Sequence, residues 1–177
     1  MRKLYAYAVF MMALLCVHDL QGQKKAGGDP TLSAVRKNAA RLQLSPYDAE
    51  NAVVSHAFTD DKTNIRYVYL QQTYQQVKVY NSIKTIALRN DEVLYSAGNF
   101  VPGIGSGSLQ ASPALPAEAA VARAAGYLKL PAPSGLQATE NTFAADKKMK
   151  FSAAGIAKQA IEAELVWTVS EDGKTIR

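Results

Sequence analysis

The side chains that most often carry catalysis or bind metals are scarce in this chain of 177 residues. It holds two histidines, His18 and His56, and one cysteine, Cys16. A thermolysin-like zinc peptidase needs H-E-x-x-H on a helix, because this spacing places two imidazoles on one face with a glutamate beside the metal-bound water. The sequence contains no such motif. Nucleophilic catalysis by Ser or Cys would need a base, and His56 is the one histidine available for it, since His18 lies in the N-terminal targeting segment. We expect the chain to have no catalytic, metal-binding or cofactor-binding residue and not to be an enzyme itself.

Three weaker candidates have simpler interpretations. His56 is expected near the end of a helix, exposed or satisfied by its neighbours. The adjacent carboxylates Asp60 and Asp61 could form one corner of a metal site, but such pairs on a turn are usually solvated. The glycines of Gly103-x-Gly105-x-Gly107 do not lead directly into a helix, as a phosphate-binding loop requires, so a linker is expected there.

The charge distribution bears on nucleic-acid binding, and the N-terminal segment bears on where the protein is located. The net charge is +5, but the basic residues are scattered, whereas a nucleic-acid-binding protein gathers them on one face. Arg2-Lys3, the uncharged run Leu4–Val17 and the small residue Gly22 predict a signal peptide over residues 1–22 and secretion. An uncleaved anchor or a lipid on Cys16 is the alternative. The apolar run is shorter than the roughly 20 residues that cross a bilayer, so no stable membrane insertion is expected after cleavage.

Residues 65–100 predict three consecutive strands. Ile65–Tyr74 is β-branched and aromatic, Val77–Leu88 follows a Gln75-Gln76 turn, and a third run begins at Val93 after Asn90-Asp91. The simple alternation of the second run places on one face Val77, Val79, Ile83, Thr85 and Ala87. Most of the strand tyrosines are expected to pack against the sheet. The alternative is a partly exposed aromatic row, since Tyr67 and Tyr69 share one parity and Tyr74 and Tyr80 the other.

Helix signals flank this sheet. Asp29-Pro30 predicts a first helix with an apolar face that extends to Leu42, and Ser45-Pro46 predicts a second helix that ends near Val54. Helices that lead into antiparallel strands indicate an α+β fold.

The second half of the chain again predicts a helix followed by strands, after a segment rich in Gly, Ser and Pro at 103–116. A helix is predicted from Ala117 to about Leu130, with Val121, Ala124 or Ala125, and Leu128 inward. Strands are predicted near Met149–Phe151 and over Ile161–Val169. The Asp172-Gly173 turn then leads into a return strand. Trp167 is expected in the core. Because a return strand needs several residues, we expect a chain cut short within a domain.

The strand sequence resembles the FTP domain, the propeptide module of secreted fungalysin and thermolysin-like zinc metallopeptidases. The resembling segments are Tyr67-Val68-Tyr69-Leu70, Gln72, Val77-x-Val79-x-Asn81 and Gly98-Asn99-Phe100-Val101-Pro102. Gln76 and Asp91 stand where the family often has glycine, which makes both turns costlier. The positions matching the family motif are Tyr67, Tyr69, Gln72, Val77, Val79, Asn81, Gly98 and Phe100.

The resemblance implies two small units of antiparallel sheet packed with helices. These are an FTP-like unit at 23–102, a linker at 103–116 and a PepSY-like unit at 117–177, the last incomplete at its C-terminus. It implies a prosegment that assists folding of a downstream metallopeptidase catalytic domain and inhibits it, with zinc in that domain and not in this chain. The alternative is a freestanding exported peptidase inhibitor or binding module that acts in trans.

Overall fold

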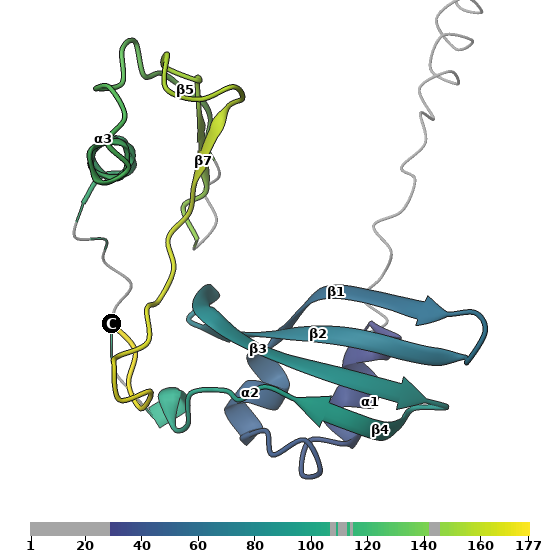
Figure 1. The fold of residues 1–177 in the computed structure, drawn as a ribbon. Coiled ribbons are helices and arrows are strands. Elements are labelled where there is room, and N and C mark those ends of the chain that lie inside the picture. The colour runs from purple at the N-terminus through teal and green to yellow at the C-terminus, as the bar shows by residue number, and fades with distance from the viewer. Residues whose placement is uncertain (1–28, 107–108, 110–112, 114, 142–145) are drawn as a thin grey trace, which may run out of the picture. The chain divides into compact units, whose positions relative to one another are not determined.

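The protein has an α+β fold with two antiparallel sheets, as the sequence predicts (Figure 1). The structure is a computed structural model and describes residues 29–106, 109, 113, 115–141 and 146–177. The first sheet and its helices comprise α1 (Pro30–Lys37), α2 (Pro46–Asn51), β1 (Val53–Asp60), β2 (Ile65–Tyr74), β3 (Val77–Arg89) and β4 (Glu92–Ala97). A short 3-10 helix, η1 (Ile104–Ser106), follows. The second sheet and its helix comprise α3 (Ala117–Tyr127), β5 (Ala138–Asn141), β6 (Met149–Phe151) and β7 (Ile161–Ala163).

The first sheet is a four-stranded meander in the order β1-β2-β3-β4. The three strands predicted over 65–100 are confirmed, but the prediction missed β1. It extended the second helix to Val54, whereas α2 ends at Asn51 and the chain turns directly into an eight-residue strand. Pairing of β1 with β2 satisfies the backbone groups on one edge of β1, and this long-range term outweighs the local helix signal.

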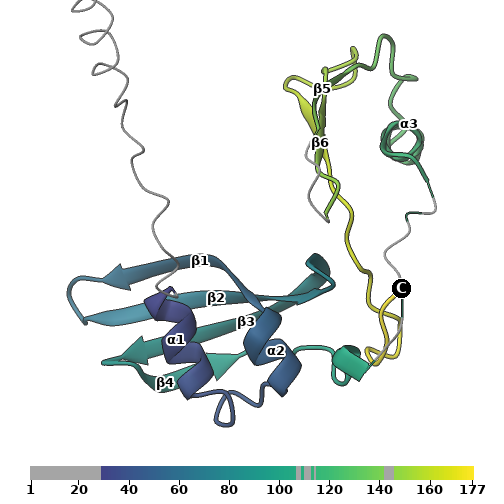
Figure 2. The ribbon, with the colours of Figure 1, turned by 180° about the vertical axis from the view of Figure 1, so that it is seen from behind.

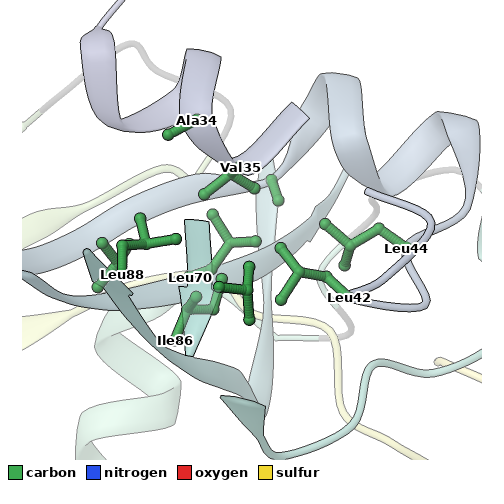
Figure 3. Packing of buried hydrophobic residues seen from close by; sticks show 10 residues of the cluster. Ala34, Val35, Leu42, Leu44, Leu70, Ile86 and Leu88 are labelled. Carbon is green, nitrogen blue, oxygen red and sulfur yellow. The ribbon is translucent and has the colours of Figure 1, made fainter. Parts of the chain in front are cut away.

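Helices α1 and α2 cover one face of this sheet, as the views from the two sides show (Figures 1 and 2). Ser45 caps α2, because its hydroxyl accepts a hydrogen bond from the Asp48 N–H at 3.1 Å. The first helix ends at Lys37, earlier than predicted, yet Leu42 beyond it remains only 1% exposed. The core between helices and sheet is shown in Figure 3 and includes Ala34, Val35, Leu42, Leu44, Leu70, Ile86 and Leu88.

The second sheet has the order β5-β6-β7, and β5 was not predicted. The helix before it starts at Ala117 as expected and ends at Tyr127. Lys129 at φ 57° then closes a turn in which the Leu130 N–H bonds the Ala125 carbonyl oxygen at 2.9 Å. Val121 and Ala125 of α3 are buried, but Leu128 is 64% exposed, so its predicted inward position is wrong.

The C-terminal segment is extended, but it is not one strand. Ile161–Val169 was predicted as a single strand, whereas β7 ends at Ala163 and only isolated bridges continue at Trp167 and Val169. The hairpin around Gly173 is confirmed, since Val169 pairs antiparallel with Ile176. Trp167 pairs in parallel with Val79 of β3, which gives the segment two different partners along its length.

Within the described ranges, no helix combines the length and the apolar character that a membrane crossing requires.

Candidate functional site

A buried polar cluster centres on Gln72 in β2, whose side chain is fully buried. Its Nε2 donates to Asp48 Oδ1 at 2.8 Å and to the Val101 carbonyl oxygen at 2.9 Å. Its Oε1 accepts from the Val101 N–H at 2.9 Å and from the Ser82 hydroxyl at 2.7 Å. All four hydrogen-bonding positions of the amide are thus used, which is what a polar group inside an apolar sheet requires. One side chain therefore connects α2, β3 and the segment that leaves β4.

The polar cluster continues into α2. Asp48 is only 4% exposed, and its Oδ2 lies 2.5 Å from the hydroxyl oxygen of Ser45. The same Ser45 hydroxyl caps the helix, so the cap and the Gln72 contact share one carboxylate. The contact between Asp48 and Gln72 of β2 therefore helps to fix the orientation of the first turn of α2.

A backbone irregularity at Asn81 creates the space for Gln72. Asn81 has a φ of 58°, and the β2–β3 pairing shifts from Gln71↔Ile83 to Thr73↔Lys78. Four residues of β3, 79–82, thus lie opposite Gln72 alone. Gln71 bridges the opening, because its Nε2 donates to the carbonyl oxygens of Val79 at 2.7 Å and Ser82 at 3.0 Å.

Because of this bulge, the predicted faces of β3 are wrong beyond Asn81. Val77 and Val79 are buried as expected, but beyond Asn81 the alternation changes phase. Ile83 is 40% exposed, whereas the positions that turn inward are Ser82, Lys84, Ile86 and Leu88. A strict period of two fails here, since a bulge inserts residues that the partner strand does not match.

An open groove of about 420 Å³ lies beside the bulge. It is lined by residues 80–82 of β3, by Asn99, Phe100 and Val101, and by Thr168, Val169 and Gly173 of the C-terminal segment. Its lining offers amides, hydroxyls, backbone groups and apolar surface. Such a groove suits hydrogen bonding to a polar or peptide-like group.

The face of the first sheet opposite α1 and α2 carries an aromatic row. Phe58, Tyr67, Ala87 and Tyr95 are successive cross-strand partners on β1 to β4. The rings of Phe58 and Tyr67 stack with centroids 5.1 Å apart, and Phe58 and Tyr95 are 45% and 64% exposed. We define the aromatic face as these residues with the next row, His56 and Tyr69, whose ring centroids are 5.9 Å apart. Amphipathic aromatic side chains of this kind are common at protein interfaces.

Lys84 is an unexpected charged residue on the face of the sheet that the helices cover. It is 5% exposed, and its Nζ donates to the Gly98 carbonyl oxygen at 2.9 Å. Burial lowers the pKa of this lysine, because the charged form loses water. Gly98 itself has a φ of 84°, and a Cβ there would lie 2.2 Å from the Ile83 carbonyl oxygen, so only glycine fits.

The structure shows where the weaker candidates from the sequence lie and what they contact. His56 lies within β1 and not near a helix end, which corrects the prediction. Asp60 closes the β1–β2 turn by accepting from the Lys62 N–H and the Thr63 hydroxyl, both at 2.9 Å, and the first of these bonds lowers its pKa most. Ile104, at the start of the predicted linker, is buried at 7% exposure. In the part of the chain that the structure describes, no three His, Cys, Asp or Glu side chains are grouped as metal ligands.

The structure brings together most of the motif positions and separates two. Gln72, Asn81, Gly98 and Phe100 lie around the bulge and the groove, with Val77 and Val79 packed beside them. Tyr67 and Tyr69 lie instead on the aromatic face. Residues that the sequence did not single out for these surfaces are Asp48, Phe58, Ser82 and Lys84. The polar run Gln71-Gln72-Thr73 inside a β-branched strand was the available signal for a buried polar cluster.

Searches of family models, of curated proteins and of solved structures find no match to this chain.

Proposed function

We propose that the chain is the prosegment of a secreted fungalysin-like zinc metallopeptidase, acting as an intramolecular chaperone and inhibitor of the catalytic domain. The observation that carries the proposal is the convergence of motif residues from three separate segments. Gln72, Asn81 and the run Gly98–Val101 resemble the FTP pattern in sequence and meet at one bulge. Because these motif residues also lie together in the structure, the proposal has more support than the sequence resemblance alone gives it.

Binding, and not chemistry, is the activity that the surfaces favour. The aromatic face offers Phe58 and Tyr95 as exposed anchors on the sheet. Aromatic side chains contribute much of the free energy of binding at protein interfaces. Tethering to a catalytic domain would add an effective concentration on the order of mM, so an intrinsic dissociation constant near micromolar suffices to keep the peptidase about 99.9% inhibited.

The test is inhibition of a separately purified catalytic domain. The chain is expressed for export, purified from the medium and titrated against a fungalysin-like zinc metallopeptidase of the same organism. We expect inhibition on the order of micromolar, and about a tenfold or greater loss in the double variant Phe58→Ala/Tyr95→Ala. Tyr127→Ala removes a ring elsewhere, at a tyrosine that is 88% exposed on α3, and should inhibit like the unchanged chain.

The result that overturns the prosegment proposal is a folded chain that leaves the peptidase fully active on the order of tens of micromolar. Equal inhibition by the double variant and the unchanged chain would instead remove the aromatic face as the contact surface. Circular dichroism of each variant shows whether the sheet is intact.

A further inference from the structure

The polar groove beside the bulge holds two side-chain amides that the fold itself does not use. Asn81 and Asn99 are both exposed, and both line this groove of about 420 Å³. Neither side-chain amide forms a hydrogen bond with another described residue. The buried amides of Gln71 and Gln72, in contrast, both donate to backbone carbonyl oxygens. Since an asparagine amide carries two N–H donors and an acceptor oxygen, the groove presents two such sets to a ligand.

Contacts inside the protein hold the backbone of both asparagines in place. Asn81 has a φ of 58°, and Gln71 Nε2 bonds carbonyl oxygens on both sides of it. Asn99 follows Gly98, a position where only glycine fits, and its carbonyl oxygen lies 3.5 Å from the Ser82 hydroxyl oxygen. Binding groups are most effective when their supporting residues already fix them. The two free amides therefore lie on a backbone that the fold has fixed before any ligand arrives.

Backbone groups around the groove are already paired within the protein. The Tyr80 N–H donates to the Trp167 carbonyl oxygen at 2.8 Å. The N–H and carbonyl groups of Val101 and of Thr168 are also hydrogen bonded. An extended peptide strand that adds to a sheet bonds mainly to backbone groups, so it would find few partners here. A ligand of this groove must therefore be recognised by side chains.

The lining of the groove favours a neutral ligand with both polar and apolar surface. None of its nine lining residues is charged, so a charged ligand would lose water without gaining an opposite charge. Tyr80 is 59% exposed, and Phe100 also lines the groove, so aromatic surface lies beside the amides. The volume lies within the range of about 300–1,000 Å³ that is usual for small-molecule sites.

We propose that this groove binds a neutral sugar unit. A pyranose ring carries neighbouring hydroxyls, which both donate and accept hydrogen bonds, and C–H groups on its two faces. The hydroxyls would bond to the amides of Asn81 and Asn99, and one face of the ring would pack on Tyr80. The groove is a different surface from the aromatic face, and the inference does not depend on the chain being a prosegment.

The test uses the full chain, labelled with ¹⁵N, and the methyl glycosides of glucose, galactose and mannose. NMR titration follows the side-chain amide signals of Asn81 and Asn99. Asn99→Ala and Asn81→Gly each remove one amide, and glycine keeps the positive φ at position 81. The matched control Asn141→Ala removes an exposed amide at the end of β5. The methyl glycosides of the corresponding uronic acids add a carboxylate to the same rings.

We expect at least one neutral glycoside to shift both amide signals with a dissociation constant on the order of 1 to 10 mM. It should bind the Asn141→Ala variant as it binds the unchanged chain. Each groove variant should bind it about five- to tenfold more weakly, since the hydrogen bonds of one amide are lost. The corresponding uronic acid glycoside should also bind more weakly. A linear trisaccharide of the same sugar that binds about tenfold tighter identifies a glycan chain as the source of the ligand, and equal binding identifies a single sugar.

Three results would overturn the proposal. The first is that none of the three neutral glycosides shifts these signals at concentrations on the order of 100 mM. The second is unchanged binding by either groove variant, with backbone amide spectra showing that the variant is folded. The third is a uronic acid glycoside that binds as tightly as its neutral counterpart.

Discussion

At the scale of single residues, the buried Gln72 side chain links several elements of the first sheet. It satisfies donors and acceptors from α2, β3 and the segment after β4, which are far apart in the sequence. The sequence marks Gln72 as unusual, since a polar residue in a β-branched strand needs partners. It does not identify Asp48 and Ser82 as those partners, because long-range contacts leave no local pattern.

Replacing Gln72 by leucine should destabilise the protein by about 3–5 kcal/mol, because several buried polar groups lose their partner at once. Urea unfolding at neutral pH, followed by circular dichroism, gives the free energy of unfolding. Gln137→Leu makes the same chemical change at an exposed position and should alter that free energy by less than about 0.5 kcal/mol. A Gln72→Leu variant as stable as the original would mean that the polar cluster contributes nothing to stability.

At the scale of elements, the β2–β3 and β3–β4 hairpins were predictable and the irregularities were not. Gln75 and Gln76 have φ values of 50° and 64°, and Asn90 and Asp91 have 51° and 63°, as two-residue turns between twisted strands require. The bulge at Asn81 could not be located from alternation, because a strict period of two gives no sign of residues that the partner strand does not match. Strand β1 was missed for a similar reason: helix-start signals at Ser45-Pro46 are strong, and its pairing with β2 is not local.

Gln76→Gly should stabilise the β2–β3 hairpin by about 0.5–1 kcal/mol, because glycine adopts a positive φ without a Cβ clash. The gain is measured as an increase in the urea midpoint at unchanged slope. Gln76→Ala keeps the Cβ and removes the rest of the side chain, so it should give no such gain. If both variants behave alike, the turn is not strained at this position.

At the scale of the whole molecule, the two predicted units each contain one antiparallel sheet, and a contact that the sequence did not predict joins the C-terminal segment to the first sheet. Trp167 packs on Tyr74 with ring centroids 5.5 Å apart, and its indole N–H donates to the Tyr74 carbonyl oxygen at 3.0 Å. Composition predicts a boundary between units in the Gly- and Ser-rich stretch after Gly103. It cannot show that a residue 93 positions away returns to the end of β2.

Trp167→Ala should release the C-terminal segment while the four-stranded sheet remains folded, since the core under α1 and α2 does not include Trp167. Limited digestion with trypsin should then cut after Lys174 on the order of tenfold faster than in the original chain. Trp167→Phe retains a ring on Tyr74 without the indole donor and should fall between the two. Unchanged cleavage in the alanine variant would show that other contacts hold the segment.

Trp167 is also the only tryptophan in the chain. Its indole is 7% exposed and lies at the point where the C-terminal segment meets β3. The protein therefore contains its own optical reporter for that contact. A red shift of the ultraviolet emission would record detachment in real time, with no dye attached.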